Sequence, residues 1–266
     1  MKSLVKDTTE FNLLIKKYIS KKYLNNGNRL IRDYRILIEE NSLYFVESPN
    51  YILFYEDCED FYNLYYFIDR EHDNVNLEDV KCNKPIVFDE VIKNGDESSE
   101  VIKCFLGSGF KKYLSRNYRE FKLGEKQFNL PEEVEFASVD EVDLICNLQD
   151  SNIDKYTGNI LSKENMLRAI EDKQVLSIKD KGKTVGYLRF LKEKKTVSLE
   201  GIVVDRDYRG SGLAKKLVEY FISYFSASDY KKIALWVRDD NLGAEKLYDY
   251  FGFESGKYIC HNYIKF

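Results

Sequence analysis

The sequence predicts an α/β fold in which helices pack on a β-sheet. Two observations predict it. Runs rich in β-branched and aromatic residues alternate with segments of helical periodicity along most of the 266 residues. One such run, Thr196–Val204, leads through a polar turn and a glycine-rich loop directly into an amphipathic helix at Gly212–Ser226.

The N-terminal half is predicted to open with a helix and to continue mainly with strands. Apolar residues recur at helical spacing within Thr8–Tyr23, and Thr8 or Thr9 can cap the start of this helix. A short helix is expected near Ser99–Leu106. Strands are expected at Leu43–Glu47, Tyr51–Tyr55, Phe61–Ile68, Pro85–Val91 and Lys111–Lys122.

The polar segment Gly124–Glu133, which contains Pro131, is interpreted as the boundary between two domains, residues 1–125 and 133–266. Further strands are expected at Val134–Ser138, Gln174–Lys179, Thr184–Leu191, Thr196–Val204, Lys232–Val237 and Lys257–Phe266. Further helices are expected at Val139–Asn147, Lys163–Asp172, Gly212–Ser226 and Ala244–Phe251.

The composition argues against several classes of protein. No unbroken apolar run reaches the ~18 residues that a membrane-spanning helix needs, so no membrane partner is expected. The net charge of -4 and the interleaved charges disfavour a nucleic-acid partner. Five cysteines without a C-x-x-C pair, and an N-terminus without an apolar export signal, indicate a cytoplasmic protein. Only two histidines are present, so no metal site is expected, and the abundance of Tyr, Phe, Lys and Asn is typical of an AT-rich bacterial genome.

A faint internal repeat relates the two halves. Glu100–Tyr113 (EVIKCFLGSGFKKY) and Glu245–Tyr258 (EKLYDYFGFESGKY) each run from a helix through Gly-Phe into a basic strand. The N-terminal half is therefore interpreted as a diverged copy of the C-terminal domain. A chance match is the alternative, because glycine commonly ends a helix.

The segment that carries chemistry is Leu199–Ala214 (LEGIVVDRDYRGSGLA), in which a strand feeds a glycine loop and then a helix. The first amides of a helix have no partner within it, and the peptide dipoles place roughly half a positive charge there. Such a helix start suits a phosphate or a pyrophosphate. The pattern is Arg-x-x-Gly-x-Ala at Arg209, Gly212 and Ala214, without the third glycine of a dinucleotide fold or the lysine of a P-loop. An ordinary glycine-rich helix start is the alternative.

Downstream residues place this loop in a wider pattern. A predicted strand ends in Trp236–Asn241 (WVRDDN), and a helix follows that carries Tyr248 and ends in Gly252-Phe253. Together with the loop, this arrangement resembles the GCN5-related N-acetyltransferase (GNAT) family over roughly the last half of the chain. The resemblance implies a mixed, mostly antiparallel sheet with flanking helices. With the internal repeat, it implies two tandem GNAT-like domains, the first without a phosphate loop.

The resemblance also implies roles for individual residues toward acetyl-CoA. Backbone groups of Ile202, Val203 and Val204, on the splayed central strand, would bind the pantetheine arm. Asn241 would contact the pantetheine region, and Tyr248 would lie near the sulfur and protonate the departing thiolate. The loop would hold the pyrophosphate mainly through its backbone N–H groups, at Arg209, Gly210, Ser211, Gly212, Leu213 and Ala214.

Several of these residues have a structural alternative. Asn241 is a suitable N-cap for the following helix, and Tyr248 is a suitable core residue on its apolar side. Glu200 resembles an acid found at this place in some amine-acetylating members, where a carboxylate can take the proton of the amine. A surface salt bridge is the alternative for Glu200, and Asp205 and Asp207 are interpreted as turn formers.

Three functions remain open at this point. The first is an N-acetyltransferase in which a neutral amine of a small molecule or peptide attacks the thioester directly and a backbone N–H holds the oxyanion. The second is a module that binds acyl-CoA without turnover. The third is an aminoacyl-tRNA-dependent transferase with tandem GNAT-like domains, which the acidic composition disfavours. The N-terminal half is expected not to bind coenzyme A tightly and to wall the acceptor cleft or to mediate a homodimer.

Overall fold

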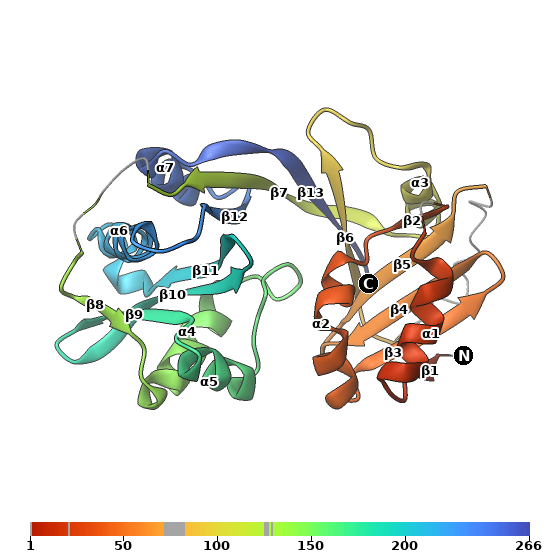
Figure 1. Cartoon of the computed structure of the whole chain (residues 1–266), viewed down its shortest axis with the longest axis horizontal. Helices are drawn as coiled ribbons and strands as arrows, with labels where there is room; N and C mark the ends of the chain where they lie inside the picture. Colours follow the sequence, from red (N-terminus) through yellow and green to blue (C-terminus); the bar gives the residue numbers. More distant parts are fainter. Residues whose placement is uncertain (1, 21, 72–82, 125–127, 129) are drawn as a thin grey trace. The chain divides into compact units, whose positions relative to one another are not determined.

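The structure is a computed structural model that describes residues 2–20, 22–71, 83–124, 128 and 130–266. The chain divides into two compact units, Met1–Ser115 with Tyr258–Phe266, and Arg116–Lys257. Strands β7 (Lys111–Lys122) and β13 (Glu254–Lys265) each contribute residues to both units (Figure 1). The strands are mostly antiparallel with a few parallel pairs, and helices flank them, so the predicted fold class is confirmed.

The first unit is a sheet that is covered on both faces. Helices α1 (Thr8–Tyr18) and α2 (Asn28–Glu39) pack on one face and α3 (Glu100–Gly107) on the other. The strand order is β1 (Ser3–Leu4), β3 (Leu43–Ser48), β4 (Tyr51–Asp57), β5 (Tyr62–Asp69), β6 (Ile86–Lys93), β13 and β7, with β2 (Tyr23–Asn25) paired to β5 beside this path.

Coverage of both faces explains the sequence of the central strands. Along β4, Ile52 and Phe54 face α1 and α2, whereas Leu53 and Tyr55 face α3. Because successive side chains of a strand point to opposite faces, a strand buried on both sides reads as a continuous apolar run.

The second unit has the same layered construction (Figure 1). Helices α6 (Leu213–Ser226) and α7 (Leu242–Phe251) lie on one face, and α4 (Val142–Asn152) and α5 (Lys163–Glu171) on the other. The strand order is β7, β12 (Lys232–Arg238), β11 (Thr196–Val204), β10 (Lys183–Glu193), β9 (Val175–Asp180) and β8 (Val134–Phe136). Short 3-10 helices occur at Val139–Glu141 and Arg206–Tyr208.

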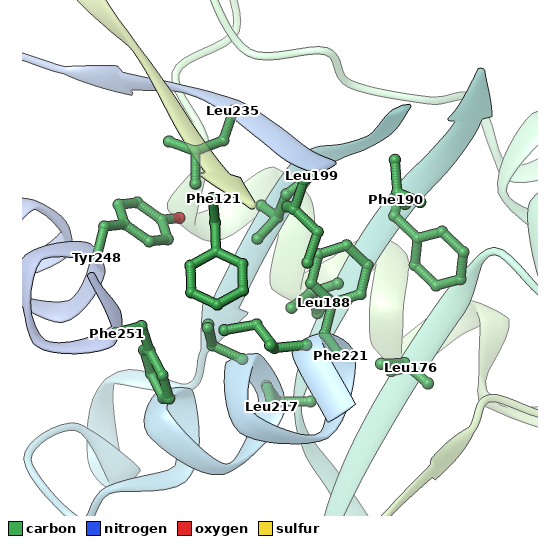
Figure 2. Packing of buried hydrophobic residues seen from close by; sticks show 14 of the residues in the cluster. Phe121, Leu176, Leu188, Phe190, Leu199, Leu217, Phe221, Leu235, Tyr248 and Phe251 are labelled. Carbon is green, nitrogen blue, oxygen red and sulfur yellow. The ribbon is translucent and has the colours of Figure 1, made fainter. Parts of the chain in front are cut away.

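Helix α6 is held by an apolar stripe. Leu217, Phe221 and Phe225 are buried one turn apart, and both phenylalanine rings contact the ring of Phe190 in β10. Figure 2 shows Leu217 and Phe221 on the helix and Phe190 on the strand. Burying a side chain of this size stabilises the fold by roughly 1.5–3 kcal/mol. This packing fixes the N-terminus of α6, which follows the glycine loop.

The structure corrects two expectations for the N-terminal half. The helix predicted at Thr8–Tyr23 ends at Tyr18, and Tyr23 begins β2 instead. Helix α2 was not predicted, because its sequence is rich in charged residues and buries only Leu30, Leu37 and Ile38. The boundary expected at Gly124–Glu133 lies partly outside the described residues. None of the described helices is long and apolar enough to cross a membrane.

Candidate functional site

Strands β11 and β12 form a parallel pair that separates before either strand ends. Pairing runs from Thr196 with Lys232 to Leu199 with Leu235. Strand β11 then continues to Val204, paired on its other side with β10. In the described part of the chain, no strand pairs with residues 200–204 on the side of β12. This open edge can therefore accept hydrogen bonds from, and donate them to, an extended ligand.

A β-bulge marks the point of separation. Arg189 lies opposite Gly201 while Phe190 lies opposite Leu199, so Glu200 is an extra residue in β11. Its carboxylate accepts a hydrogen bond from Asn159 Nδ2 at 2.8 Å. Glu200 is half-buried, and among the described residues none forms an ion pair with it.

The bulge changes the direction of the residues that follow. Val203 is buried among the side chains of α4 and α5, whereas Ile202 and Val204 pack against the cluster beneath α6 and α7. The side chains of the three strand residues predicted to bind the cofactor therefore lie on different faces of the sheet. Only their backbone groups lie along the same open edge. The sequence pattern did not reveal this bulge, because Glu200 fits a regular strand equally well.

The turn after β11 ends in two glycines with left-handed backbone. Gly210 has φ 81° and Gly212 has φ 87°, a region that side chains other than glycine rarely adopt. A Cβ built on either glycine would meet nothing within 4 Å, so the space beside the loop is open. Before it, Asp205 accepts a hydrogen bond from the Asp207 N–H at 3.1 Å and forms the turn.

Two amides of the loop are used within the protein. The Arg209 N–H donates to the carbonyl of Arg206 at 3.3 Å, and the Ser211 N–H donates to the carbonyl of Tyr208 at 3.4 Å. Arg209 places its guanidinium on Asn152 Oδ1 at 2.7 Å. These two residues were predicted to offer their amides to a phosphate, and in this structure the protein accepts both.

The other amides of the loop have no acceptor among the residues that the structure describes. They belong to Gly210, Gly212, Leu213 and Ala214. The last three amides lie at the start of α6, where the helix offers no carbonyl to accept their hydrogen bonds. The positive end of the helix dipole lies there too. These four amides are therefore the ones that an anion can use.

A pocket of about 290 Å³ lies beside these amides. Its described lining contains two cations, Arg209 and Lys215, and no acidic side chain. Lys215 also lies 4.1 Å from the centre of the Tyr250 ring. The lining comprises Val204, Tyr208, Arg209, Gly210, Gly212, Leu213, Ala214, Lys215, Gly243 and Leu247.

The pocket unites part of the predicted site. Val204 and most of the glycine loop line it. The other predicted residues do not: Glu200, Ile202, Val203, Ser211, Asn241 and Tyr248. Tyr208, Lys215, Gly243 and Leu247 were not predicted. Two of them could have been found from the sequence by their neighbours. Lys215 lies in the first turn of α6, and Leu247 directly precedes Tyr248 on α7.

Tyr248 extends from α7 into the apolar cluster beside Phe121 and Phe253, and is 4% exposed (Figure 2). Burial raises the pKa of its hydroxyl well above the ordinary value. Among the described residues, none forms a hydrogen bond with this hydroxyl. A hydroxyl without a partner in the protein can form a hydrogen bond with water or with a ligand.

Asn241 is the N-cap of α7, which was the structural alternative to a role in binding the cofactor. Its Oδ1 accepts a hydrogen bond from the Ala244 N–H at 3.1 Å, and the residue is exposed. The cap fixes where α7 begins, and thereby the position of Gly243 at the pocket.

Helix α7 is also anchored from β7. The Arg119 guanidinium donates hydrogen bonds to the carboxylates of Glu245 and Asp249, which lie on either side of Tyr248 in the helix. Its guanidinium also donates to the carbonyl of Phe253, just after the helix, at 3.4 Å. No group of three or more His, Cys, Asp or Glu side chains in the described part of the chain is arranged to hold a metal ion.

Comparison with known proteins gives a family for this region. The profile described as "Acetyltransferase (GNAT) family" matches residues 146–253. N-acetylaspartate synthetase from Xenopus tropicalis is 32% identical over 85 residues, which are 31% of this chain and 31% of that protein. The match thus spans about a third of that relative's length.

Solved structures extend the similarity of fold beyond this region. A GCN5-related N-acetyltransferase from Sphaerobacter thermophilus has a TM-score of 0.64 at 13% identity, over 90% of this chain and 85% of that chain. A GNAT-family acetyltransferase from Colwellia psychrerythraea has a TM-score of 0.56 at 15% identity, over 100% of both chains. The fold of both units is therefore found in acetyltransferases.

Proposed function

We propose that the chain is an N-acetyltransferase that moves the acetyl group of acetyl-CoA to a primary amine, from the premise that residues 146–253 match the GNAT acetyltransferase family. One observation carries the proposal. The four free amides at the start of α6 and the open edge of β11 meet at one pocket, which Val204 and the loop both line.

The parts of acetyl-CoA match the parts of this site. The amides of Gly210, Gly212, Leu213 and Ala214 suit the diphosphate, and the nearby cations suit its charge. The pantetheine arm contains amide groups, which suit the open backbone edge at Ile202–Val204. In this proposal Asn241 contacts the same arm from the start of α7.

Two further residues would serve the chemistry. Glu200 takes a proton from the ammonium of the acceptor, directly or through water. The amine nitrogen then forms a bond to the thioester carbonyl carbon, and a backbone N–H of β11 holds the oxyanion. When the C–S bond breaks, the Tyr248 hydroxyl gives its proton to the thiolate. The nitrogen loses its second proton as the amide forms, and this proton returns to Tyr248. Glu200 releases its own proton to water, so the net products are the amide, the thiol and one proton.

A transfer assay tests this proposal. The full chain is incubated with acetyl-CoA and a panel of primary amines, and the free thiol and the acetylated product are measured. The panel begins with aspartate and other amino acids, because the matched relative is named as an N-acetylaspartate synthetase. Polyamines and peptide N-termini follow.

The expected result is thiol release that depends on at least one amine. Acetyl-CoA that stabilises the protein while no amine accelerates thiol release would contradict the transferase and favour a module that only binds acyl-CoA.

A further inference from the structure

The first unit contains a diverging strand pair like that of the second. Strands β5 and β6 pair in parallel only at Tyr62 with Ile86 and at Asn63 with Val87. Both strands then continue, while β4 pairs along the other side of β5. The first unit therefore has a counterpart of the open edge on β11.

The helix that follows supports this correspondence. Helices α3 and α7 are each followed by a glycine of positive φ and a buried phenylalanine. The Phe110 N–H donates to the carbonyl of Phe105 at 3.1 Å, and the Phe253 N–H donates to the carbonyl of Tyr248 at 3.0 Å. Phe105 thus occupies the place of Tyr248 and has no hydroxyl to serve as an acid.

The chain itself covers the edge of β5 in this unit. Strand β2 pairs antiparallel with β5, from Tyr23 with Asp69 to Asn25 with Phe67. The next residue, Asn26, continues the contact through its backbone N–H, which donates to the carbonyl of Tyr66 at 3.3 Å.

The side chain of Asn26 completes the coverage. Its Oδ1 accepts from the Tyr66 N–H at 2.7 Å, and its Nδ2 donates to the carbonyl of Leu64 at 3.0 Å. The same Nδ2 donates to the carbonyl of Asp89 in β6 at 3.1 Å, so one amide group spans both diverging strands. Gly27 follows, and a Cβ there would lie 2.2 Å from the ring of Phe67, so a side chain at this position would force the ring or the segment to move.

These hydrogen bonds have a chemical meaning. A carboxamide that donates to one backbone carbonyl and accepts from an amide two residues on makes the contacts of an amide ligand added to a strand edge. We propose that Tyr23–Asn26 takes the place of a pantetheine arm in the first unit. The segment fills the slot, which is the edge of β5 where this strand separates from β6. The chain accordingly binds one acetyl-CoA, at the second unit. The single site rests on the proposed function, whereas the filled slot does not.

Binding stoichiometry tests the single site. Isothermal titration of the full chain with acetyl-CoA is expected to give one site per chain, and Gly212→Glu is expected to remove all binding. Two sites per chain, or saturable binding that survives in Gly212→Glu, would overturn the proposal. An absence of binding to the wild-type chain would refute the proposed function.

Thermal unfolding tests the filled slot independently of acetyl-CoA. Asn26→Ala leaves the Tyr66 N–H and the carbonyls of Leu64 and Asp89 without this partner, and a loss of about 5 °C in Tm is expected. The matched control is Asn28→Ala, at the exposed start of α2 and without a hydrogen bond from its side chain to any described residue. Its expected loss is under about 1 °C. Equal losses in the two variants would show that Asn26 does not hold the slot closed.

Discussion

Arg119 in β7 and Glu245 in α7 form an ion pair with an N–O distance of 2.7 Å. The side chain of Arg119 is 9% exposed and that of Glu245 is 21% exposed, so the pair is largely removed from water. Glu245 lies one helical turn before Tyr248. The pair therefore fixes the turn of the helix that presents the proposed acid.

Arg119→Met tests this positioning role. The variant leaves a half-buried carboxylate unpaired, so we expect a loss of stability of about 1–3 kcal/mol. We also expect kcat to fall about tenfold, because small displacements of a reacting group are costly. The dissociation constant for acetyl-CoA should change by less than about threefold, since the free amides lie on α6. Arg119→Lys is the control and should recover part of kcat; a merely structural role would lower stability and leave kcat of the folded enzyme unchanged.

Tyr248→Phe separates catalysis from stability. Tyr248 is 4% exposed and its hydroxyl has no hydrogen-bond partner among the described residues, so removal of the hydroxyl should leave Tm nearly unchanged. Loss of the proton donor should lower kcat by roughly 10²-fold or more. Paired measurements of thermal unfolding and initial rates check this prediction. Wild-type kcat in the variant would exclude the acid role.

The pH dependence of kcat follows from the same burial. Desolvation raises the pKa of Tyr248 above its ordinary value of 10.0, so the hydroxyl keeps its proton throughout the neutral and moderately basic range. An acid is active while protonated, and kcat should therefore show no loss from this group below pH 10. A rate profile of the wild type and of Tyr248→Phe checks this. A basic limb with an apparent pKa below 10 that disappears in the variant would contradict it.

Glu200→Gln tests the proposed base. Glutamine keeps an oxygen for Asn159 Nδ2, so the bulge should remain and stability should change little. Without the carboxylate, kcat/KM should fall roughly 10²-fold at neutral pH and recover as pH approaches the pKa of the amine, because the amine then arrives deprotonated. An unchanged pH profile would leave Glu200 with a structural role only.

The fold class could be predicted from the sequence because the signals for its helices and strands lie within each element. Strands β7 and β11 occupy the predicted ranges, and the start of α6 lies within one residue of its prediction. Periodicity and glycine position decide these elements without help from distant residues. Helix α2 was missed because its short apolar stripe becomes informative only once the sheet beneath it is known.

The site was predicted less completely than the fold. The glycine loop carried a local signal, but the bulge at Glu200 depends on the register between β10 and β11. The Arg209 and Ser211 amides donate hydrogen bonds to carbonyls of the same turn, and these bonds depend on the conformation that the turn adopts. The role of Asn26 depends on a pairing with residues about forty positions away, which no local pattern encodes.

Binding of acetyl-CoA to Gly212→Glu tests the central claim most directly. A glutamate at this glycine, with φ 87° and open space beside it, places a negative charge among the free amides. Gly182→Glu is the matched control, since Gly182 has φ 81°, equally open surroundings and a position outside the pocket. Calorimetric titration should show wild-type affinity in Gly182→Glu and no binding in Gly212→Glu. Equal affinity in both variants would contradict a diphosphate site at the start of α6.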